Sequence, residues 1–372
     1  MACSINKKAT NWLILTSTCG AAIAPYQNIM QNKPAPAFPV DLEPSTPDHF
    51  IYKLPKTEMH LHLEGSFSLD QYKQVVDVPS DWTPEGWQPN YQYPTFDHFE
   101  QFILGYGDKW FNSPQRYLES AKAIFEAKLR EGVTYMECSF GVIVCQIHGL
   151  PIDEVIDAIK SVVPAELELR LHMGLHHNSW NPEMEKALTD ALSIKQLDGI
   201  DLHGPEDFPI QDWLVDYWTA ARSAGLHTKA HAGELGKAAD VREAIEKLGV
   251  RRIEHGLRAV DDPEVVALLK EYNVVCDICP VSNYKLKASK DYASHPLRQL
   301  VDAGITCTIN TDDPFIFGST INDEFIVLDQ QAGFSKAELL QLARNGFEQA
   351  MVTTEQKTKF LSDFDIAAKA LI

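Results

Sequence analysis

The chain has 372 residues, of which 45% are hydrophobic and 23% charged, a balance typical of a globular protein with a sizeable core. Its formal net charge of −19 would repel a phosphate backbone and argues against a nucleic-acid partner. The seven cysteines form no regular disulfide framework, and no apolar run approaches the roughly 20 residues of a membrane helix. We therefore expect a cytoplasmic protein without a membrane span, and the sequence predicts no protein partner.

Residues 1–50 are proline-rich without a clear hydrophobic period, which predicts an N-terminal tail. The pair Lys7–Lys8 precedes a short apolar stretch, Trp12–Leu15, and small residues follow at Ala22–Ala24. This pattern outlines a signal segment, but its apolar core is thin and Pro25 follows the candidate cleavage site. A disordered tail is the favoured interpretation, and an exported form with a cleaved N-terminus stays open.

From Lys53 onward, short apolar or β-branched runs alternate with amphipathic stretches of helical length. The predicted strands are Thr57–His62, Val133–Cys138, Leu167–Gly174, Gly199–His203, Leu226–His231, Arg251–His255, Asn273–Ile278 and Ile305–Asn310. Helices are predicted between most of them, for example at Arg116–Arg130, Asp153–Val163 and Asp212–Ala224. Ser335 and Glu338 form a capping box that opens a late helix.

Eight strand–helix units of this kind predict a single (β/α)₈ barrel over residues 51–372. The structural alternative is a doubly wound parallel sheet. That fold usually carries a glycine-rich dinucleotide-binding turn after its first strand, and none occurs here. We therefore favour the barrel.

The segment from about residue 78 to 111 interrupts the alternation with aromatic residues set among prolines and glycines. These are Trp82, Trp87, Tyr91, Tyr93, Phe96, Phe99, Tyr106 and Trp110. An aromatic loop after the first barrel strand can close over a ligand, or it can form a small core packed against the barrel. The sequence favours neither interpretation over the other.

Polar residues gather where four of the predicted strands end. His60 and His62 end the first strand, and because residues i and i+2 of a strand face the same side, both imidazoles can converge on one ion. His231, His255 and Asp312 follow later strands. All strand ends of a parallel barrel meet at one face, which is where active sites of this fold are built. Buried charged residues cost several kcal/mol unless they are paired or bind a metal, and histidines and carboxylates in such number favour a metal.

The candidate metal ligands are therefore His60, His62, His231 and Asp312. Nitrogen and oxygen ligands of this kind suit one Zn²⁺ ion, although Fe²⁺, Mn²⁺ or Co²⁺ could use them too. Glu234, His255 and Asp313 stand beside these ligands without being needed as ligands, and this surplus of acid–base groups indicates a catalytic metal.

A second metal pattern, His62-Leu63-Glu64 with Cys276 and Cys279, superficially matches the H-x-E and C-x-x-C of cytidine-type zinc deaminases. The proline that normally precedes the first cysteine is missing, and the two halves lie far apart in the chain. We interpret both cysteines as ordinary buried residues.

Seven segments together resemble the adenosine deaminase family of the amidohydrolase superfamily. They are PKTEMHLHLEGS from Pro55, GIDLHGPE from Gly199, HAGE from His231, RRIEHG from Arg251, CPVSNYKL from Cys279, HPLRQLVDAG from His295 and TINTDDP from Thr308. The resemblance runs from about Leu54 to the C-terminus in the order of the family, and jointly the motifs are very specific.

The resemblance implies a role for each matching position. His60, His62, His231 and Asp312 match the metal ligands, Glu234 matches the acid that protonates the purine ring nitrogen N1, and His255 with Asp313 matches the pair that orients and deprotonates the attacking water. Gly204 matches the residue whose backbone meets the purine edge, and Glu64, His62 and Asp313 are expected to contact the substrate.

Two residues depart from the nucleoside-specific pattern. Many nucleoside-specific members carry Asp at the position of Glu64 and Gly at the position of Glu254, whereas the acids found here resemble the adenine deaminases. The segment GIDLHGPE looks more like the nucleoside type.

The resemblance as a whole implies hydrolytic deamination of adenosine, or a close derivative, to the 6-oxo purine and ammonia. Free adenine and 5′-modified adenosines, such as methylthioadenosine and aminodeoxyfutalosine, are the alternatives. Hydrolysis of another bond by the same superfamily barrel is more distant, because Glu234 would have no ring nitrogen to protonate.

Overall fold

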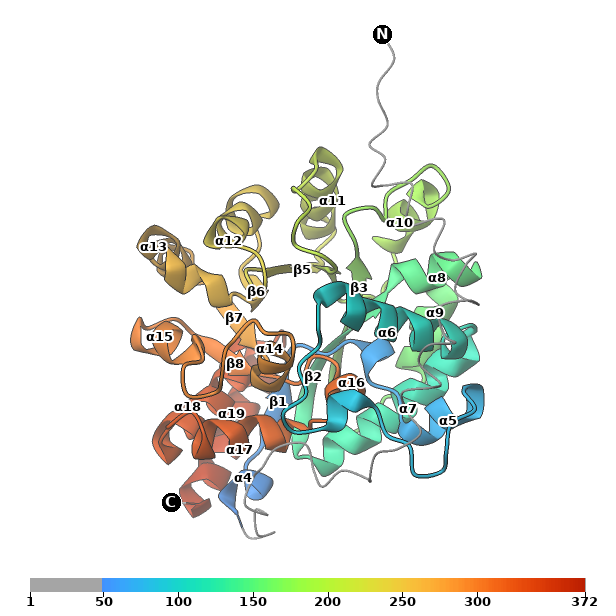
Figure 1. Ribbon diagram of the computed structural model, residues 1–372. Coiled ribbons are helices and arrows are strands. Elements are labelled where there is room, and N and C mark those ends of the chain that lie inside the picture. The colour runs from blue at the N-terminus through green and yellow to red at the C-terminus, as the bar shows by residue number, and fades with distance from the viewer. Residues whose placement is uncertain (1–48, 372) are drawn as a thin grey trace.

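The computed structural model describes residues 49–371, and its eight parallel strands are arranged in sequence order around a barrel (Figure 1). The strands are β1 (Lys56–Glu58), β2 (Val133–Gly141), β3 (Glu168–Leu175), β4 (Gly199–Leu202), β5 (His227–Ala232), β6 (Arg252–His255), β7 (Val275–Ile278) and β8 (Cys307–Ile309). The predicted (β/α)₈ barrel is confirmed. The tail and signal segment predicted before residue 49 lie outside the described residues.

The helices surround the strands, as Figure 1 shows in a view along the barrel. They are α4 (Phe50–Lys53), α5 (Leu69–Val75), α6 (Phe96–Trp110), α7 (Pro114–Arg130), α8 (Val142–His148), α9 (Ile152–Lys160), α10 (Glu185–Ala191), α11 (Asp212–Ser223), α12 (Ala238–Glu243), α13 (Pro263–Glu271), α14 (Pro280–Lys285), α15 (Leu297–Asp302), α16 (Pro314–Phe317), α17 (Ile321–Gln330), α18 (Lys336–Gln349) and α19 (Thr354–Leu371). Shorter turns are η2 (Leu63–Gly65), η3 (Glu85–Trp87), η4 (Ala244–Leu248) and η5 (Leu257–Asp261). Ser335 caps α18 in the predicted capping box. Within residues 49–371, no helix has both the length and the apolar character needed to cross a membrane.

The barrel closes between the segments that follow β1 and β8. The backbone N–H of Asp312 donates to the carbonyl of His60 at 3.0 Å, and the N–H of His62 donates to the carbonyl of Asp312 at 3.0 Å. The first strand is shorter than the predicted Thr57–His62, because the N–H of Met59 donates to the side chain of Asn310 at 2.7 Å instead of to a strand neighbour. The residues that close the barrel are thus the same residues that carry the candidate ligands.

Charged side chains fill part of the barrel interior. Nζ of Lys229 on β5 lies 2.9 Å from Oε2 of Glu137 on β2 and 3.3 Å from Oε1 of Glu254 on β6. Nη2 of Arg252 lies 2.6 Å from Oδ2 of Asp277 on β7. All five side chains are buried. Charges survive in such a place only when they are paired, so each of these residues depends on the others.

The aromatic-rich segment packs against its neighbours and also reaches the cavity, whereas its closure over a ligand stays a prediction. Trp82 stacks on Tyr72 with ring centroids 4.7 Å apart, and Phe99 of α6 stacks on Phe317 with centroids 5.2 Å apart, so the segment has a core of its own. Phe99 also lines the cavity above the strand ends. One side of α6 therefore packs on neighbouring segments while the same helix forms a wall of the cavity.

We predict that Lys229→Met destabilises the protein by about 3–5 kcal/mol, because the substitution leaves the buried carboxylates of Glu137 and Glu254 without their shared cation. Urea denaturation measures the free energy of unfolding. Lys186→Met on α10 is the control, since Lys186 makes only an exposed pair with Asp190, and it should change stability far less. A Lys229→Met protein as stable as the control would contradict this account.

Candidate metal centre and active site

Four side chains with metal-binding atoms converge at the carboxyl end of the strands. His60 and His62 follow β1, His231 lies near the end of β5, and Asp312 follows β8. Nε2 of His60 lies 3.2 Å from Nε2 of His62 and 3.1 Å from Nε2 of His231. Oδ1 of Asp312 lies 3.4 Å from Nε2 of His60 and 3.1 Å from Nε2 of His62. The four ligands predicted from sequence are thus brought together.

The outer nitrogens of the imidazoles determine which atoms face the centre of this cluster. Nδ1 of His60 lies 3.3 Å from the carbonyl oxygen of Asp277, and Nδ1 of His231 lies 2.9 Å from that of Leu202. A carbonyl oxygen only accepts, so each Nδ1 carries a proton, and in the neutral rings each Nε2 faces inward with a lone pair. Inward lone pairs beside a carboxylate oxygen repel one another unless a cation lies between them. The donor set therefore fits a divalent metal ion.

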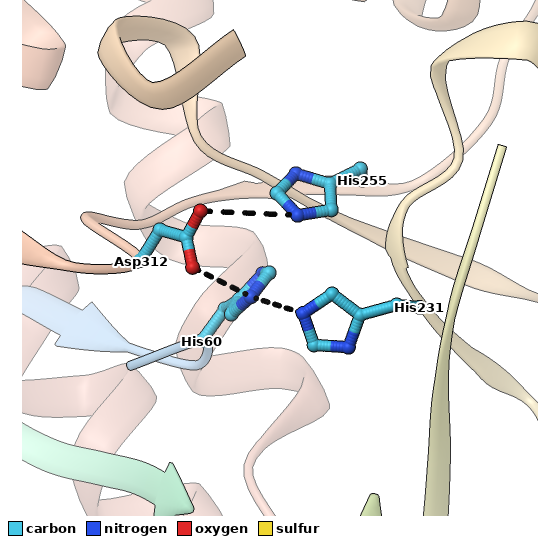
Figure 2. A group of neighbouring side chains, drawn as sticks. All are labelled: His60, His231, His255 and Asp312. Carbon is cyan, nitrogen blue, oxygen red and sulfur yellow. Dashed lines mark hydrogen bonds and ion pairs between the residues drawn. The ribbon is translucent and has the colours of Figure 1, made fainter. Parts of the chain in front are cut away.

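Two residues of the site have strained backbones. Asp312 has φ = 64° and His255 has φ = 66°, and they are two of only four non-glycine residues with positive φ among residues 49–371. Such a conformation costs roughly 1–3 kcal/mol and persists where the surroundings enforce it, often at functional sites. Figure 2 shows the result, with His255 and Asp312 turned toward one another beside His60 and His231.

A chain of hydrogen bonds orients the acid–base groups. The N–H of Leu297 donates to Nδ1 of His295 at 3.1 Å, so the proton of His295 is on Nε2, which donates to Oδ1 of Asn283 at 3.3 Å. The amide nitrogen of Asn283 then donates to Oε1 of Glu234 at 2.8 Å and to Nδ1 of His255 at 3.0 Å. Because Nδ1 of His255 accepts, its proton is on Nε2.

His255 therefore presents an N–H, not a lone pair, toward the cluster. Its Nε2 lies 3.9 Å from Oδ2 of Asp312. His255 is therefore close to the candidate metal ligands, but in this tautomer it is not one of them. Ser282 holds the same oxygen of Asp312 by donating its hydroxyl proton at 2.7 Å.

Asp313 is buried against η2 beside this cluster. Its side chain is 2% exposed, and its Oδ1 has no hydrogen-bond partner within the described part of the chain. A Cβ at Gly65 would lie 1.7 Å from that oxygen, so only glycine allows this approach. Burial, with Asp312 close by, raises the pKa of Asp313 well above its ordinary value.

Glu234 is also buried, at 6% exposure. Burial, followed by the charges of Asp312 and Glu206, raises the pKa of Glu234 to about 8. Its carboxyl group is therefore able to hold a proton at neutral pH. One oxygen accepts from Asn283, which leaves the other available to a ligand.

A cavity of about 740 Å³ opens above the strand ends. Its floor includes His62, His231, Asp312 and the acid–base groups, and one wall is formed by α6. A volume of this size is usual for a small-molecule site.

Comparison with known proteins decides the family. The model of the adenosine deaminase family matches residues 55–367. An adenine deaminase of Rhodopseudomonas palustris is 31% identical over 333 residues, covering 86% of this chain and 95% of that protein. An adenosine deaminase of Shewanella loihica is 31% identical over 323 residues, covering 82% and 96%. A zinc-bound amidohydrolase structure from Burkholderia ambifaria shares the fold with a TM-score of 0.74 at 22% identity, covering 90% of this chain and 98% of that one.

The chain belongs to the adenosine deaminase family. It is accordingly a hydrolase that deaminates purines of the adenine or adenosine type. The predicted family and enzyme class are confirmed.

Of the other residues singled out from the sequence of this deaminase, two line the cavity and one does not. Glu64 lines the cavity, and its Oε1 accepts from the hydroxyl of Tyr117 at 2.8 Å and from the N–H of Gly141 at 2.9 Å. Gly204 also lines the cavity, with φ = 88°. Glu254 does not line it, because its Oε2 lies 2.9 Å from Nδ1 of His231 in the barrel interior. Any effect of Glu254 on substrate choice is therefore indirect.

Sequence reasoning did not single out several residues that support the site. Asn283 and Ser282 lie in the quoted segment CPVSNYKL, and His295 begins another, but their targets are far away in sequence. Glu206 accepts backbone N–H groups from the loop after β5. Their place inside the family-like motifs could have drawn attention to these polar residues. Their hydrogen-bond partners, however, could be identified only in the folded chain.

Proposed function

We propose that this protein is a zinc-dependent hydrolytic deaminase that converts adenosine, or a close derivative, to the 6-oxo purine and ammonia. The observation that carries the proposal is Glu234, a buried carboxyl with a raised pKa, beside a donor set that fits a metal. Other hydrolases of this barrel type need such a donor set but have no use for a protonated carboxyl at the position of a purine ring nitrogen.

We infer that His60, His62, His231 and Asp312 hold the metal, with zinc favoured. Three imidazoles and one carboxylate suit zinc, and the related amidohydrolase from Burkholderia ambifaria was crystallised with zinc. A metal held by these residues lowers the pKa of water from 15.7 to about 7, which supplies hydroxide at neutral pH. Glu254 and Asp277 lie behind His231 and His60 and hold these imidazoles in the required tautomer.

Glu234 acts as the general acid in this proposal. Attack at C6 of the purine moves charge onto the ring, and a proton delivered to N1 neutralises that charge. The hydrogen bond from Asn283 fixes one oxygen of Glu234 and leaves the other for N1.

Asp313 and His255 divide the handling of the attacking water. The partnerless, buried Oδ1 of Asp313 is the group that accepts its proton. His255 directs its Nε2–H toward the same region and donates to the developing negative charge. Asn283 keeps His255 in this tautomer, so it acts as a positioning residue.

The cavity favours a ligand larger than a base. It extends from the strand ends to α6, and Glu64 is anchored by Tyr117 and Gly141 at a point where it can accept from a sugar hydroxyl. Free adenine is the second candidate substrate, because the Rhodopseudomonas palustris relative is an adenine deaminase and Glu64 matches that type.

The experiment that tests the function is a substrate panel with zinc-loaded protein, read by the loss of the 6-amino chromophore in the ultraviolet. The panel holds adenosine, 2′-deoxyadenosine, 5′-methylthioadenosine, 6-amino-6-deoxyfutalosine and adenine. We expect the highest kcat/KM on adenosine. Preference for adenine or a 5′-modified nucleoside would reassign the substrate and keep the chemistry, whereas no turnover on any compound would contradict deamination.

We predict that Glu234→Gln lowers kcat by about 10²–10⁴-fold while zinc content is unchanged, because glutamine has no proton to give. In the unsubstituted enzyme the protonated form of Glu234 is the active one. Activity should therefore fall as the pH rises through its raised pKa of about 8. Near-normal turnover in Glu234→Gln would contradict the assignment. Glu154→Gln on α9, outside the cavity, is the control and should behave as the parent enzyme.

A further inference from the structure

The cavity is strongly acidic. Ten acidic side chains line it, although Glu234 and Asp313 among them have raised pKa values, and they face one lysine and no arginine. The lysine is the exposed Lys237. Burial lowers the pKa of His176 and His177, which also line it, so they stay neutral at pH 7 and add no positive charge. The lining imidazoles of His62, His231 and His255 lie on the floor, at the candidate metal centre. Away from the strand ends, where a bound metal would supply positive charge, the cavity therefore offers almost nothing to neutralise an anionic ligand.

One feature that could have held a phosphate is already filled by the protein. Consecutive backbone N–H groups of the loop after β5 point the same way, as in the amide clusters that bind anions. The carboxylate of Glu206 accepts from the N–H groups of Glu234 and Leu235, at 2.9 Å each, and from that of Gly236. Because these donors are occupied by a fixed carboxylate, a substrate phosphate would meet repulsion there instead of hydrogen bonds.

The wall formed by α6 adds an unbalanced carboxyl group. Glu100 on α6 is half-buried and lines the cavity, and its Oε1 is buried with no hydrogen-bond partner in the described part of the chain. Burial, followed by the charges of Asp97 on the same helix and Asp207 on the loop after β4, raises the pKa of Glu100 to about 7. The surroundings that oppose ionisation of Glu100 also oppose the binding of a phosphate beside it, because both add negative charge at the same wall.

We propose that Glu100, together with Asp97, Asp207 and the anchored Glu206, is a specificity determinant that excludes anionic purines, so that the enzyme takes uncharged bases and nucleosides and rejects their 5′-phosphates. The proposal rests on the proposed function only for the location of the purine. It separates this enzyme from fold relatives such as the N6-methyl-AMP deaminase of Arabidopsis thaliana. Glu100 acts through charge and takes no part in the chemical step.

The test compares two ligands that differ only by the phosphate. Binding of inosine and of inosine 5′-monophosphate to zinc-loaded protein is measured by calorimetry at pH 8 and low ionic strength, where Glu100 is ionised. In parallel, kcat/KM is measured for adenosine and AMP. We expect the phosphorylated ligand to bind at least about 100-fold more weakly, and added salt to narrow the difference because it screens the carboxylates.

Glu100→Gln removes one charge at nearly constant volume. We expect it to improve the ratio of phosphorylated to unphosphorylated ligand by about three- to tenfold, in binding and in kcat/KM. The control Glu154→Gln removes a charge on α9, outside the cavity, and should leave the ratio unchanged. A wild-type protein that binds the two ligands within about threefold, or a Glu100→Gln protein with an unchanged ratio, would overturn the proposal.

The calorimetry keeps the two proposals distinct. If inosine binds and is preferred over its phosphate but no purine is deaminated, the selectivity stands and the proposed reaction fails. If purines are deaminated and AMP is used as well as adenosine, the reaction stands and the selectivity fails. If neither ligand binds, both fail.

Discussion

The structure depends on holding four electron-rich atoms close together at the end of the barrel. The Nε2 atoms of His60, His62 and His231 lie 3.1–3.2 Å from one another, and Oδ1 of Asp312 lies 3.1–3.4 Å from those of His60 and His62. Left alone, the inward lone pairs of neutral His60 and His231 and the carboxylate of Asp312 repel one another. The fold meets this constraint with the backbone itself, because the hydrogen bonds that join the β1 and β8 ends are made by His60, His62 and Asp312. The hydrogen bonds that close the barrel therefore also bring the candidate ligands together, and the strained φ of Asp312 is part of this arrangement.

Neighbouring charges shift the pKa values of two buried carboxyl groups in opposite directions. The pKa of Glu254 is lowered despite its burial, because the imidazoles of His60 and His231 and the ammonium of Lys229 surround it. Glu234 is equally buried but has Asp312 and Glu206 nearby, so its pKa is raised. Glu254 is therefore suited to remain ionised behind the imidazole of His231, and Glu234 is suited to carry a proton to a substrate. As a consequence, the loss of one buried cation, such as Lys229, leaves several buried carboxylates without a partner.

The sequence predicted the barrel and the convergence of the ligands, because both follow from local patterns: strand–helix alternation, and polar residues placed where strands end. The supporting contacts could not be derived in this way. Asn283 reaches Glu234 from 49 residues away and Glu206 reaches the same loop from 28 residues away, so only the folded chain pairs them. The length of the first strand was overestimated for a similar reason, since a distant side chain, Asn310, replaces a backbone partner. The aromatic segment could not be assigned from sequence because Phe99 of α6 both stacks on Phe317 and lines the cavity, and aromatic residues serve either purpose.

The most direct measurement is X-ray absorption at the zinc edge on zinc-loaded protein, with metal content determined on the same sample. The account predicts one zinc per chain, bound by three imidazole nitrogens and by oxygen, with no sulfur ligand. Cys279 makes the spectrum decisive, because its Sγ lies 3.4 Å from Nδ1 of His60, on the side of the ring away from the cluster. A sulfur ligand at about 2.3 Å, or a protein that retains no metal, would contradict the assignment of the site.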